Sequence, residues 1–173
     1  MNKYTLIKDY GAINDRIKIV ANQINKDYYR LKIDIVCLTN AATFFAVDLI
    51  RMLEIPTSFH QLGFTSYENS NAIGAIKINN DIDMPLFGKH VLVLEGMIIS
   101  GRTPLYIMNY LRLREPASLQ ICAVGIKPKM LLPSLSVKYC LFEFTNEWII
   151  GYGIGSGVDQ TSFALFDKKK PIK

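Results

Sequence analysis

A hydrophobic run, a glycine-containing turn and a helical pattern follow one another within residues 90–114, and this order constrains the fold more than any other feature of the chain. The run HVLVLE at 90–95 is typical of a central buried strand, and PLYIMNYLRLR at 104–114 predicts a helix with proline in its first turn. The connecting residues 94–103, LEGMIISGRT, lead into the amino terminus of that helix. Unpaired backbone N–H groups and the helix dipole favour an anion there, so the turn is predicted to bind a phosphate group.

The same alternation of strand and helix patterns extends along the chain. Apolar residues recur at helical spacing between Ile13 and Ile24, where Asn14 or Asp15 is expected to help cap the helix, and a second helical pattern covers about 42–53. Short apolar runs predict strands at 33–38, 57–63, 74–78, 90–95, 119–126 and 137–144. This alternation predicts an α/β fold with a mostly parallel sheet.

The length and hydrophobic content indicate one domain. With 173 residues, of which 50% are hydrophobic, the chain can bury one sizeable core but is too short for two ordinary domains, so we expect a single domain over 1–173. The polar segment SYENSNAI, 66–73, has no periodic pattern and is expected to be a mobile loop over or near a site.

The charge pattern does not favour nucleic acid. The net charge is +5, but Lys and Arg are spread along the chain except in the terminal KKKPIK, which is expected to be a solvated end. Cys37, Cys122 and Cys140 each stand alone in apolar runs, which indicates buried thiols in a reducing compartment. Neither a signal-peptide pattern nor an apolar segment of membrane-spanning length is present. We therefore expect a cytoplasmic protein without a nucleic-acid or membrane partner.

Residues 94–103 resemble the ribose-5-phosphate-binding signature of the type I phosphoribosyltransferases, V-E-D-I-I-D-T-G-x-T, although two of its three acids are missing. The spacing from Lys127-Pro128 to FEFTNEWIIGYG at 142–153 resembles that of the hypoxanthine-guanine branch of the family. The resemblance extends from about Ile13 to Gly157. It implies a doubly wound, mostly parallel sheet, with a small hood made from the chain ends and with ligands bound beyond the carboxyl ends of the strands.

The resemblance also implies a pocket for a 6-oxopurine nucleoside monophosphate such as IMP or GMP. Residues 100–103 would wrap the 5′-phosphate, and Glu95 would lie near the ribose hydroxyls. Lys127 would donate a hydrogen bond to the purine 6-oxo group, which disfavours adenine. Trp148 would stack on the base, and the backbone of Ile149 would contact the base edge. The full set of implied ligand-binding residues is Glu95, Ser100, Gly101, Arg102, Thr103, Lys127, Trp148 and Ile149.

The residues that handle diphosphate, metal and proton in the family are replaced in this chain. By the resemblance, Gly96 stands at the position of the second acid, and Ile99 at the position of the acid near purine N7. Gly155 stands at the position of the metal-binding aspartate, and Thr161 approximately at that of the arginine that holds pyrophosphate. Residues 38–41, Leu38–Ala41, stand at the position of the early pyrophosphate loop. Each change removes a charge or the backbone freedom of glycine. We therefore assign no catalytic residue and no metal ligand. Mg²⁺ would be carried by the substrate, and phosphoribosyl transfer is expected to be slow or absent.

Several alternatives stay open. Without the resemblance, Trp148 would be interpreted as a core aromatic residue and Lys127 as an exposed lysine at a strand end. His60 and His90 have no partner at metal-ligand spacing and are expected to be structural or exposed. The chain is either a purine-salvage enzyme that still makes IMP or GMP, or a non-catalytic purine-nucleotide sensor or inactive partner subunit. A homo-oligomer, dimer or tetramer, is expected in either case.

Overall fold

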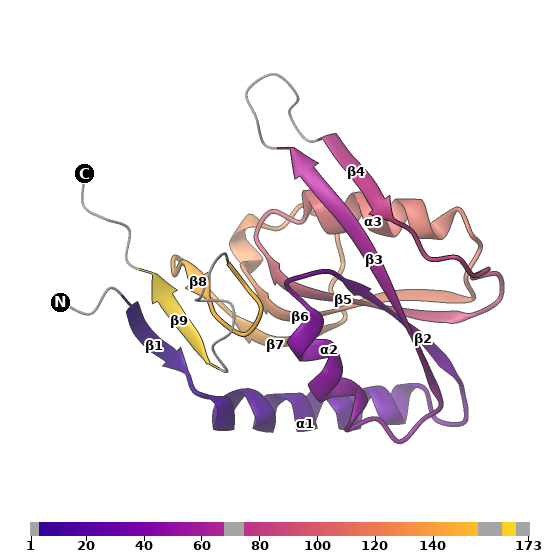
Figure 1. The fold of residues 1–173 in the computed structure, drawn as a ribbon. Coiled ribbons are helices and arrows are strands. Elements are labelled where there is room, and N and C mark those ends of the chain that lie inside the picture. Colours follow the sequence, from indigo (N-terminus) through magenta and orange to yellow (C-terminus); the bar gives the residue numbers. More distant parts are fainter. Residues whose placement is uncertain (1–3, 68–74, 156–163, 169–173) are drawn as a thin grey trace.

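The computed structural model describes residues 4–67, 75–155 and 164–168, and a six-stranded sheet forms its centre (Figure 1). The strands in spatial order are β4 (Ala75–Asn80), β3 (Thr57–Tyr67), β2 (Ile33–Leu38), β5 (His90–Ile98), β6 (Ser118–Ile126) and β7 (Tyr139–Glu143). Strand β4 pairs antiparallel with β3 at one edge, and the other four neighbouring pairs are parallel. The predicted α/β fold with a mostly parallel sheet is confirmed.

Helices cover both faces of the central sheet, as the implied doubly wound topology requires. The helices are α1 (Tyr10–Asp27), α2 (Thr43–Ile50) and α3 (Arg102–Arg112). Successive strand residues point to opposite faces, so Ile35 and Cys37 of β2 pack in one apolar cluster with α1 and α2. Val36 and Leu38 of the same strand pack in a second cluster with α3. All six residues of β2 are buried, which explains why five of them are apolar without alternation; the sixth is Asp34.

The first helix begins earlier than predicted. Its amino-terminal cap is Asp9, whose carboxylate accepts a hydrogen bond of 2.8 Å from the N–H of Ala12. The prediction that Asn14 or Asp15 caps this helix is therefore wrong, because both residues lie inside it. The apolar pattern starts only at Ile13, so the exposed first turn gave no periodic signal.

Several other boundaries differ from the predicted ones by a few residues. Strand β3 continues past 63 to Tyr67, because Tyr67 pairs with Ala75 at the start of β4. Helix α2 ends at Ile50 and not at 53, and the N–H of Leu53 closes a turn onto the carbonyl of Ile50. Most of the predicted loop SYENSNAI falls in 68–74, outside the described residues.

A second, smaller sheet joins the two ends of the chain. It contains β1 (Tyr4–Lys8), β9 (Leu165–Lys168) and β8 (Ile149–Ile150), with β9 in the middle and both pairings antiparallel. Figure 1 shows this sheet set apart from the central one, beside the start of α1. It is the small hood of chain ends that the resemblance implies.

The three cysteines are free thiols. Cys37 and Cys122 are buried and Cys140 is half-buried. Burial in apolar surroundings raises the pKa of Cys37 and of Cys140 to about 11, so these thiols are poor nucleophiles. In the part of the chain that the structure describes, no helix is long and apolar enough to cross a membrane.

Candidate functional site

The predicted strand, turn and helix are present, with shifted limits. Strand β5 runs to Ile98, three residues beyond its predicted end, and α3 begins at Arg102 and not at Pro104. The turn between them is therefore only Ile99–Gly101. Gly101 caps the helix in the left-handed region at φ 81°, and a Cβ atom there would overlap the side chain of Leu135. Glycine is thus required at this position both by the backbone and by its neighbour.

A pocket of about 250 Å³ lies at this turn. Its walls are Phe64, Glu95, Met97, Ile98, Ile99, Ser100, Gly101, Arg102, Thr103 and Pro104. The amino terminus of α3 opens here, where the N–H of Arg102 lies 3.5 Å from the hydroxyl oxygen of Ser100. Helix N–H groups, two hydroxyls and an exposed guanidinium therefore surround one small volume, which suits an anion of phosphate size.

Glu95 forms the buried wall of the same pocket. The residue is 8% exposed, and its carboxylate accepts a hydrogen bond of 2.8 Å from the N–H of Gly96. Desolvation by burial raises the pKa of Glu95 to about 7, against a smaller lowering by that hydrogen bond. Near neutral pH the group therefore exchanges between a carboxylate that accepts and a carboxylic acid that can also donate.

Lys127 follows β6 and lies beside the turn. Its N–H donates to the carbonyl of Ile98 at 3.0 Å, which ties the end of β6 to the end of β5. The residue is only 8% exposed, so the interpretation as an ordinary exposed lysine is wrong. None of the ion pairs among the described residues involves Lys127. An ammonium group has three donors and no acceptor, so it is suited to a carbonyl acceptor on a ligand.

A second hollow of about 640 Å³ contains Lys127. Its lining is Lys127, Pro128, Lys129, Met130, Glu143, Phe144, Thr145 and Asn146, from the 3₁₀ helix η1 (Pro128–Met130) and the end of β7. Sequence reasoning missed the contribution of Phe144 and Met130. Phe144 belongs to the segment FEFTNEW that carries the resemblance. It follows β7 directly and lines the hollow, which the sequence pattern did not indicate.

Trp148 and Ile149 lie at the edge of the hood. Trp148 is 51% exposed, so the interpretation as a core aromatic residue is wrong. Its N–H donates to the carboxylate of Asp167 at 2.8 Å, which fixes the backbone to β9. Ile149 is buried at the start of β8 and pairs with Asp167. Trp148 is not among the residues that line the hollow around Lys127.

Of the positions at which the family's acids are missing, only Ile99 is among the residues that line the phosphate pocket. Ile99 lines the pocket and is 40% exposed, and its hydrocarbon side chain cannot accept a proton. Gly96 lies directly after Glu95 in β5, and Gly155 is exposed after the last turn of the segment that follows β8. Thr161 lies outside the described residues. Within the described ranges, no cluster of three or more His, Cys, Asp or Glu side chains could hold a metal ion.

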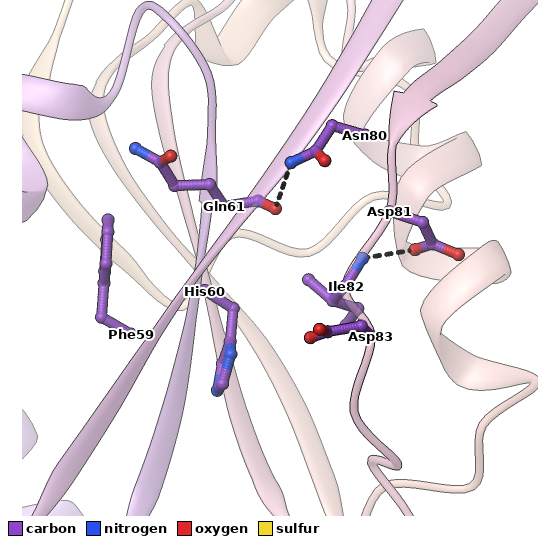
Figure 2. A pocket seen from close by; sticks show the side chains of 7 residues that line it. All are labelled: Phe59, His60, Gln61, Asn80, Asp81, Ile82 and Asp83. Atoms are coloured by element: carbon purple, nitrogen blue, oxygen red, sulfur yellow. Dashed lines mark hydrogen bonds between the residues drawn. The ribbon is translucent and has the colours of Figure 1, made fainter.

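A third hollow lies away from these positions, at the edge of the sheet between β3 and the chain that follows β4 (Figure 2). It measures about 530 Å³ and is lined by Phe59, His60, Gln61, Asn80, Asp81, Ile82 and Asp83. Nε2 of His60 lies 3.0 Å from the carboxylate of Asp34, which is only 2% exposed. His90 is held by Ser118 at 2.9 Å. Both histidines therefore have structural partners.

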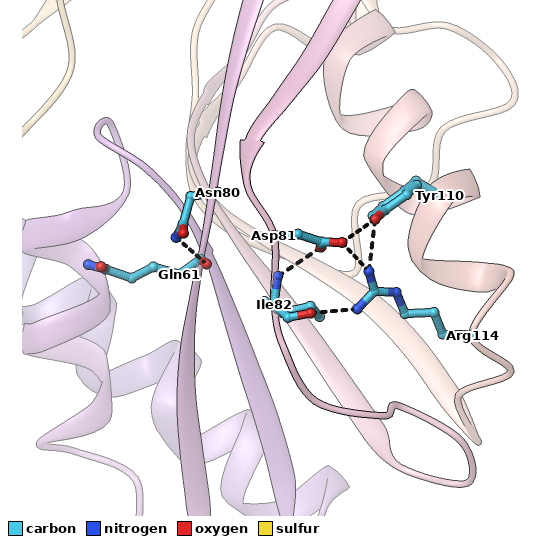
Figure 3. Close-up of polar contacts among 6 residues, drawn as sticks. All are labelled: Gln61, Asn80, Asp81, Ile82, Tyr110 and Arg114. Atoms are coloured by element: carbon cyan, nitrogen blue, oxygen red, sulfur yellow. Dashed lines mark hydrogen bonds and ion pairs between the residues drawn. The ribbon is translucent and has the colours of Figure 1, made fainter.

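The chain after β4 is tied to α3 by a polar network (Figure 3). The carboxylate of Asp81 accepts from the N–H of Ile82 and from the side chains of Tyr110 and Arg114. Arg114 also donates to the carbonyl of Ile82 at 2.9 Å. This network fixes the chain between β4 and β5 to α3. Asp81 and Ile82, which line one wall of the third hollow, therefore have a structural role.

Comparisons with known proteins agree with this geometry. The family model described as "Phosphoribosyl transferase domain" matches residues 3–156. The hypoxanthine-guanine phosphoribosyltransferase of Mycobacterium tuberculosis is 31% identical over 149 residues, covering 82% of this chain and 74% of the relative. The hypoxanthine phosphoribosyltransferase of Haemophilus influenzae is 33% identical over 146 residues, covering 82% of each chain.

Solved structures show the same fold. The hypoxanthine-guanine phosphoribosyltransferase of Bacillus anthracis, with a HEPES molecule in its active site, has a TM-score of 0.89 at 26% identity and covers 94% of this chain and 97% of that chain. The hypoxanthine phosphoribosyltransferase of Staphylococcus aureus has a TM-score of 0.90 at 22% identity, which shows the fold alone, and covers 95% and 91%. The chain therefore belongs to the phosphoribosyltransferase family, and within it to the purine phosphoribosyltransferases of the hypoxanthine-guanine kind.

Proposed function

We propose that this protein binds a 6-oxopurine nucleoside monophosphate, IMP or GMP, and transfers phosphoribosyl from phosphoribosyl diphosphate to hypoxanthine or guanine slowly or not at all. One contrast carries the proposal. The chain has a pocket of phosphate size and a lysine at position 127, whereas Gly96, Ile99 and Gly155 supply no acid. A monophosphate needs the first set, and a departing diphosphate needs the second.

The 5′-phosphate would lie in the pocket of about 250 Å³, against the amino terminus of α3. Backbone N–H groups at a helix amino terminus can bind a phosphate monoester without a metal, and Arg102 would add a positive charge. Glu95 would receive the ribose hydroxyls, as donor or acceptor according to its protonation. These contacts are to the part of the ligand that IMP, GMP and phosphoribosyl diphosphate share.

The base would lie in the neighbouring hollow, with its 6-oxo group on Nζ of Lys127. An ammonium group has three donors and no acceptor, so it favours a carbonyl and disfavours the amino group of adenine. Phe144 and Met130 supply apolar surface in this hollow. The half-exposed ring of Trp148 would cover the base from the hood, and the backbone of Ile149 would contact the base edge.

The described residues do not fit a protein-held magnesium ion. Magnesium prefers carboxylate, phosphate and water oxygens, and Glu95 has a pKa near neutrality and no acidic neighbour at Gly96. Any Mg²⁺ would therefore enter on the diphosphate itself. No acid stands at Ile99 to handle the purine proton, and loss of general acid–base catalysis alone typically slows a reaction by about 10²–10⁴-fold.

A non-catalytic role, as a purine-nucleotide sensor or as the inactive partner of another subunit, is the second candidate. It is favoured by the same contrast, because the changes fall on the residues for turnover and spare those for nucleotide binding. In either role we expect a cytoplasmic homo-oligomer, a dimer or a tetramer.

Calorimetry and a steady-state assay test the proposal. GMP is expected to bind at least tenfold more tightly than phosphoribosyl diphosphate, measured with and without Mg²⁺. Trp148→Ala should weaken GMP binding, whereas Tyr106→Ala, which removes an aromatic ring of similar exposure from α3, should not. A turnover number of ordinary size with hypoxanthine or guanine, for which enzymes typically reach about 1–10³ s⁻¹, would contradict the loss of transfer.

A further inference from the structure

The connection between β2 and α2 packs directly against β5. A Cβ atom placed on Gly96 would lie 2.7 Å from the carbonyl oxygen of Ala41, 2.8 Å from its Cβ and 3.0 Å from its carbonyl carbon. Real Cβ atoms essentially never approach another atom more closely than 3.0 Å, and the shortest of these separations is to a backbone oxygen, which cannot rotate away. Any residue other than glycine at position 96 would therefore have to displace the connection at Ala41.

A second glycine holds the same peptide group from another side. A Cβ atom on Gly153, which has φ 87°, would lie 3.0 Å from the same carbonyl oxygen of Ala41. Gly96 belongs to β5, whereas Gly153 belongs to the segment that follows β8. The carbonyl group of Ala41 is thus wedged between two chain segments that approach it closely only because each has a hydrogen in place of a side chain.

These three segments are the ones that the family resemblance assigns to diphosphate and metal. Leu38–Ala41 corresponds to the pyrophosphate loop, Gly96 to the second acid, and Gly155, two residues after Gly153, to the metal-binding aspartate. The glycine at 96 and the position of the loop are therefore physically linked, because Ala41 occupies the volume in which a side chain on residue 96 would begin.

We propose that Ala41 closes the diphosphate subsite and determines the selectivity of this chain for monophosphates. The proposal rests on the proposed function, which it deepens. A carbonyl oxygen is a hydrogen-bond acceptor, so the peptide wedged between the glycines offers no donor to an anionic diphosphate. The phosphate pocket at α3 differs in this respect, because it presents backbone N–H groups. The phosphate pocket at α3 is open, whereas Ala41 occupies the volume in which a side chain on residue 96 would begin.

The closure predicts coupling between positions 41 and 96. Gly96→Asp alone should lower the Tm by roughly 2–12 °C, the range expected for overpacking in a chain of this length, and should not improve binding of phosphoribosyl diphosphate. Ala41→Gly removes one of the two clashing groups and gives the connection more backbone freedom. The double variant should therefore recover part of the lost Tm and bind phosphoribosyl diphosphate with Mg²⁺ at least tenfold more tightly than the parent.

The experiment compares the parent, both single variants and the double variant by thermal unfolding and by calorimetry with phosphoribosyl diphosphate and with GMP. Gly96→Ala replaces Gly96→Asp if the latter does not fold, since its methyl group alone meets Ala41. Gly11→Ala is the matched control: its added Cβ would have 3.5 Å to the nearest atom, so the Tm should not fall. Additive changes in Tm, or tight binding of phosphoribosyl diphosphate by the parent, would overturn the closure. Failure of the parent to bind GMP would overturn the proposed function. The Tm values would still show whether positions 41 and 96 are coupled.

Discussion

Replacing Glu95 by glutamine should remove a pH-dependent loss of stability. Burial raises the pKa of Glu95 to about 7 in the folded chain, from an ordinary value of 4.5. The difference of about 2.5 pH units, at about 1.4 kcal/mol per unit, corresponds to about 3 kcal/mol. Since the residue is only 8% exposed, solvent screening reduces this figure little. Glutamine keeps the carbonyl oxygen that accepts from the N–H of Gly96 but carries no charge.

The direction of the effect follows from proton binding. Between about pH 4.5 and pH 7 the folded chain holds the proton on Glu95 while the unfolded chain releases it. The free energy of unfolding therefore falls as the pH rises through this window, and the full penalty is present above pH 7. The Glu95→Gln variant should be close to the parent in stability at pH 4.5, and more stable than the parent by up to about 3 kcal/mol at pH 8.

Urea denaturation at half-unit steps from pH 4.5 to pH 8 measures this difference. The parent and the variant differ in this one side chain, so the difference between their pH profiles isolates Glu95. Glu115→Gln, at an exposed position, controls for the loss of one negative charge and should follow the parent. Parallel pH profiles for Glu95→Gln and the parent would refute the assignment of a buried carboxyl group with a raised pKa.

Three further outcomes are expected. Gly101→Ala should destabilise the fold by about 1–3 kcal/mol and weaken GMP binding, because the added methyl group overlaps the side chain of Leu135. Urea denaturation measures the loss of stability. Gly88→Ala is the control for backbone strain, because Gly88 also has a positive φ but a Cβ there would have no atom within 4 Å. Lys127→Ala should weaken GMP binding roughly 10- to 100-fold in calorimetry, as the loss of a charged hydrogen bond predicts. Lys18→Ala, on an exposed helix surface, should leave GMP affinity unchanged. Equal GMP affinities of Lys127→Ala and the parent would remove Lys127 from the site. Tyr110→Phe should lower the free energy of unfolding by about 0.5–1.5 kcal/mol without affecting GMP affinity, and a change in affinity would show that the network is coupled to the nucleotide site.

The parts of the fold that could be predicted from sequence are those in which one local pattern decides the outcome. The run IDIVCL at 33–38 has apolar residues on both faces because it lies in the middle of a parallel sheet, so its pattern, apart from Asp34, agrees with its position. The turn before α3 was also predictable, since Gly101 marks a left-handed cap. The cap at Asp9 was missed because the first turn of α1 carries no apolar residue that is buried.

The site was less accessible to such reasoning. Lys127 is charged, and composition alone places a lysine at the surface; only the resemblance indicated a buried functional group. The pair of His60 with Asp34 spans 26 residues and depends on the register of two parallel strands, which no local pattern encodes. The close approach of Ala41 to Gly96 likewise arises from tertiary packing, so no local pattern indicates that these two departures from the family lie side by side.

The middle position of β9 in the hood has a practical consequence for protein engineering. Asp167 on this strand anchors the backbone of Trp148, and β1 pairs with the opposite edge of the same strand. An affinity tag fused close to β1 or β9, or a truncation that removes β9, would therefore disturb the ring assigned to the purine. Purification handles for this protein need long spacers, and a weak ligand in a tagged preparation should be measured again after the tag has been cleaved.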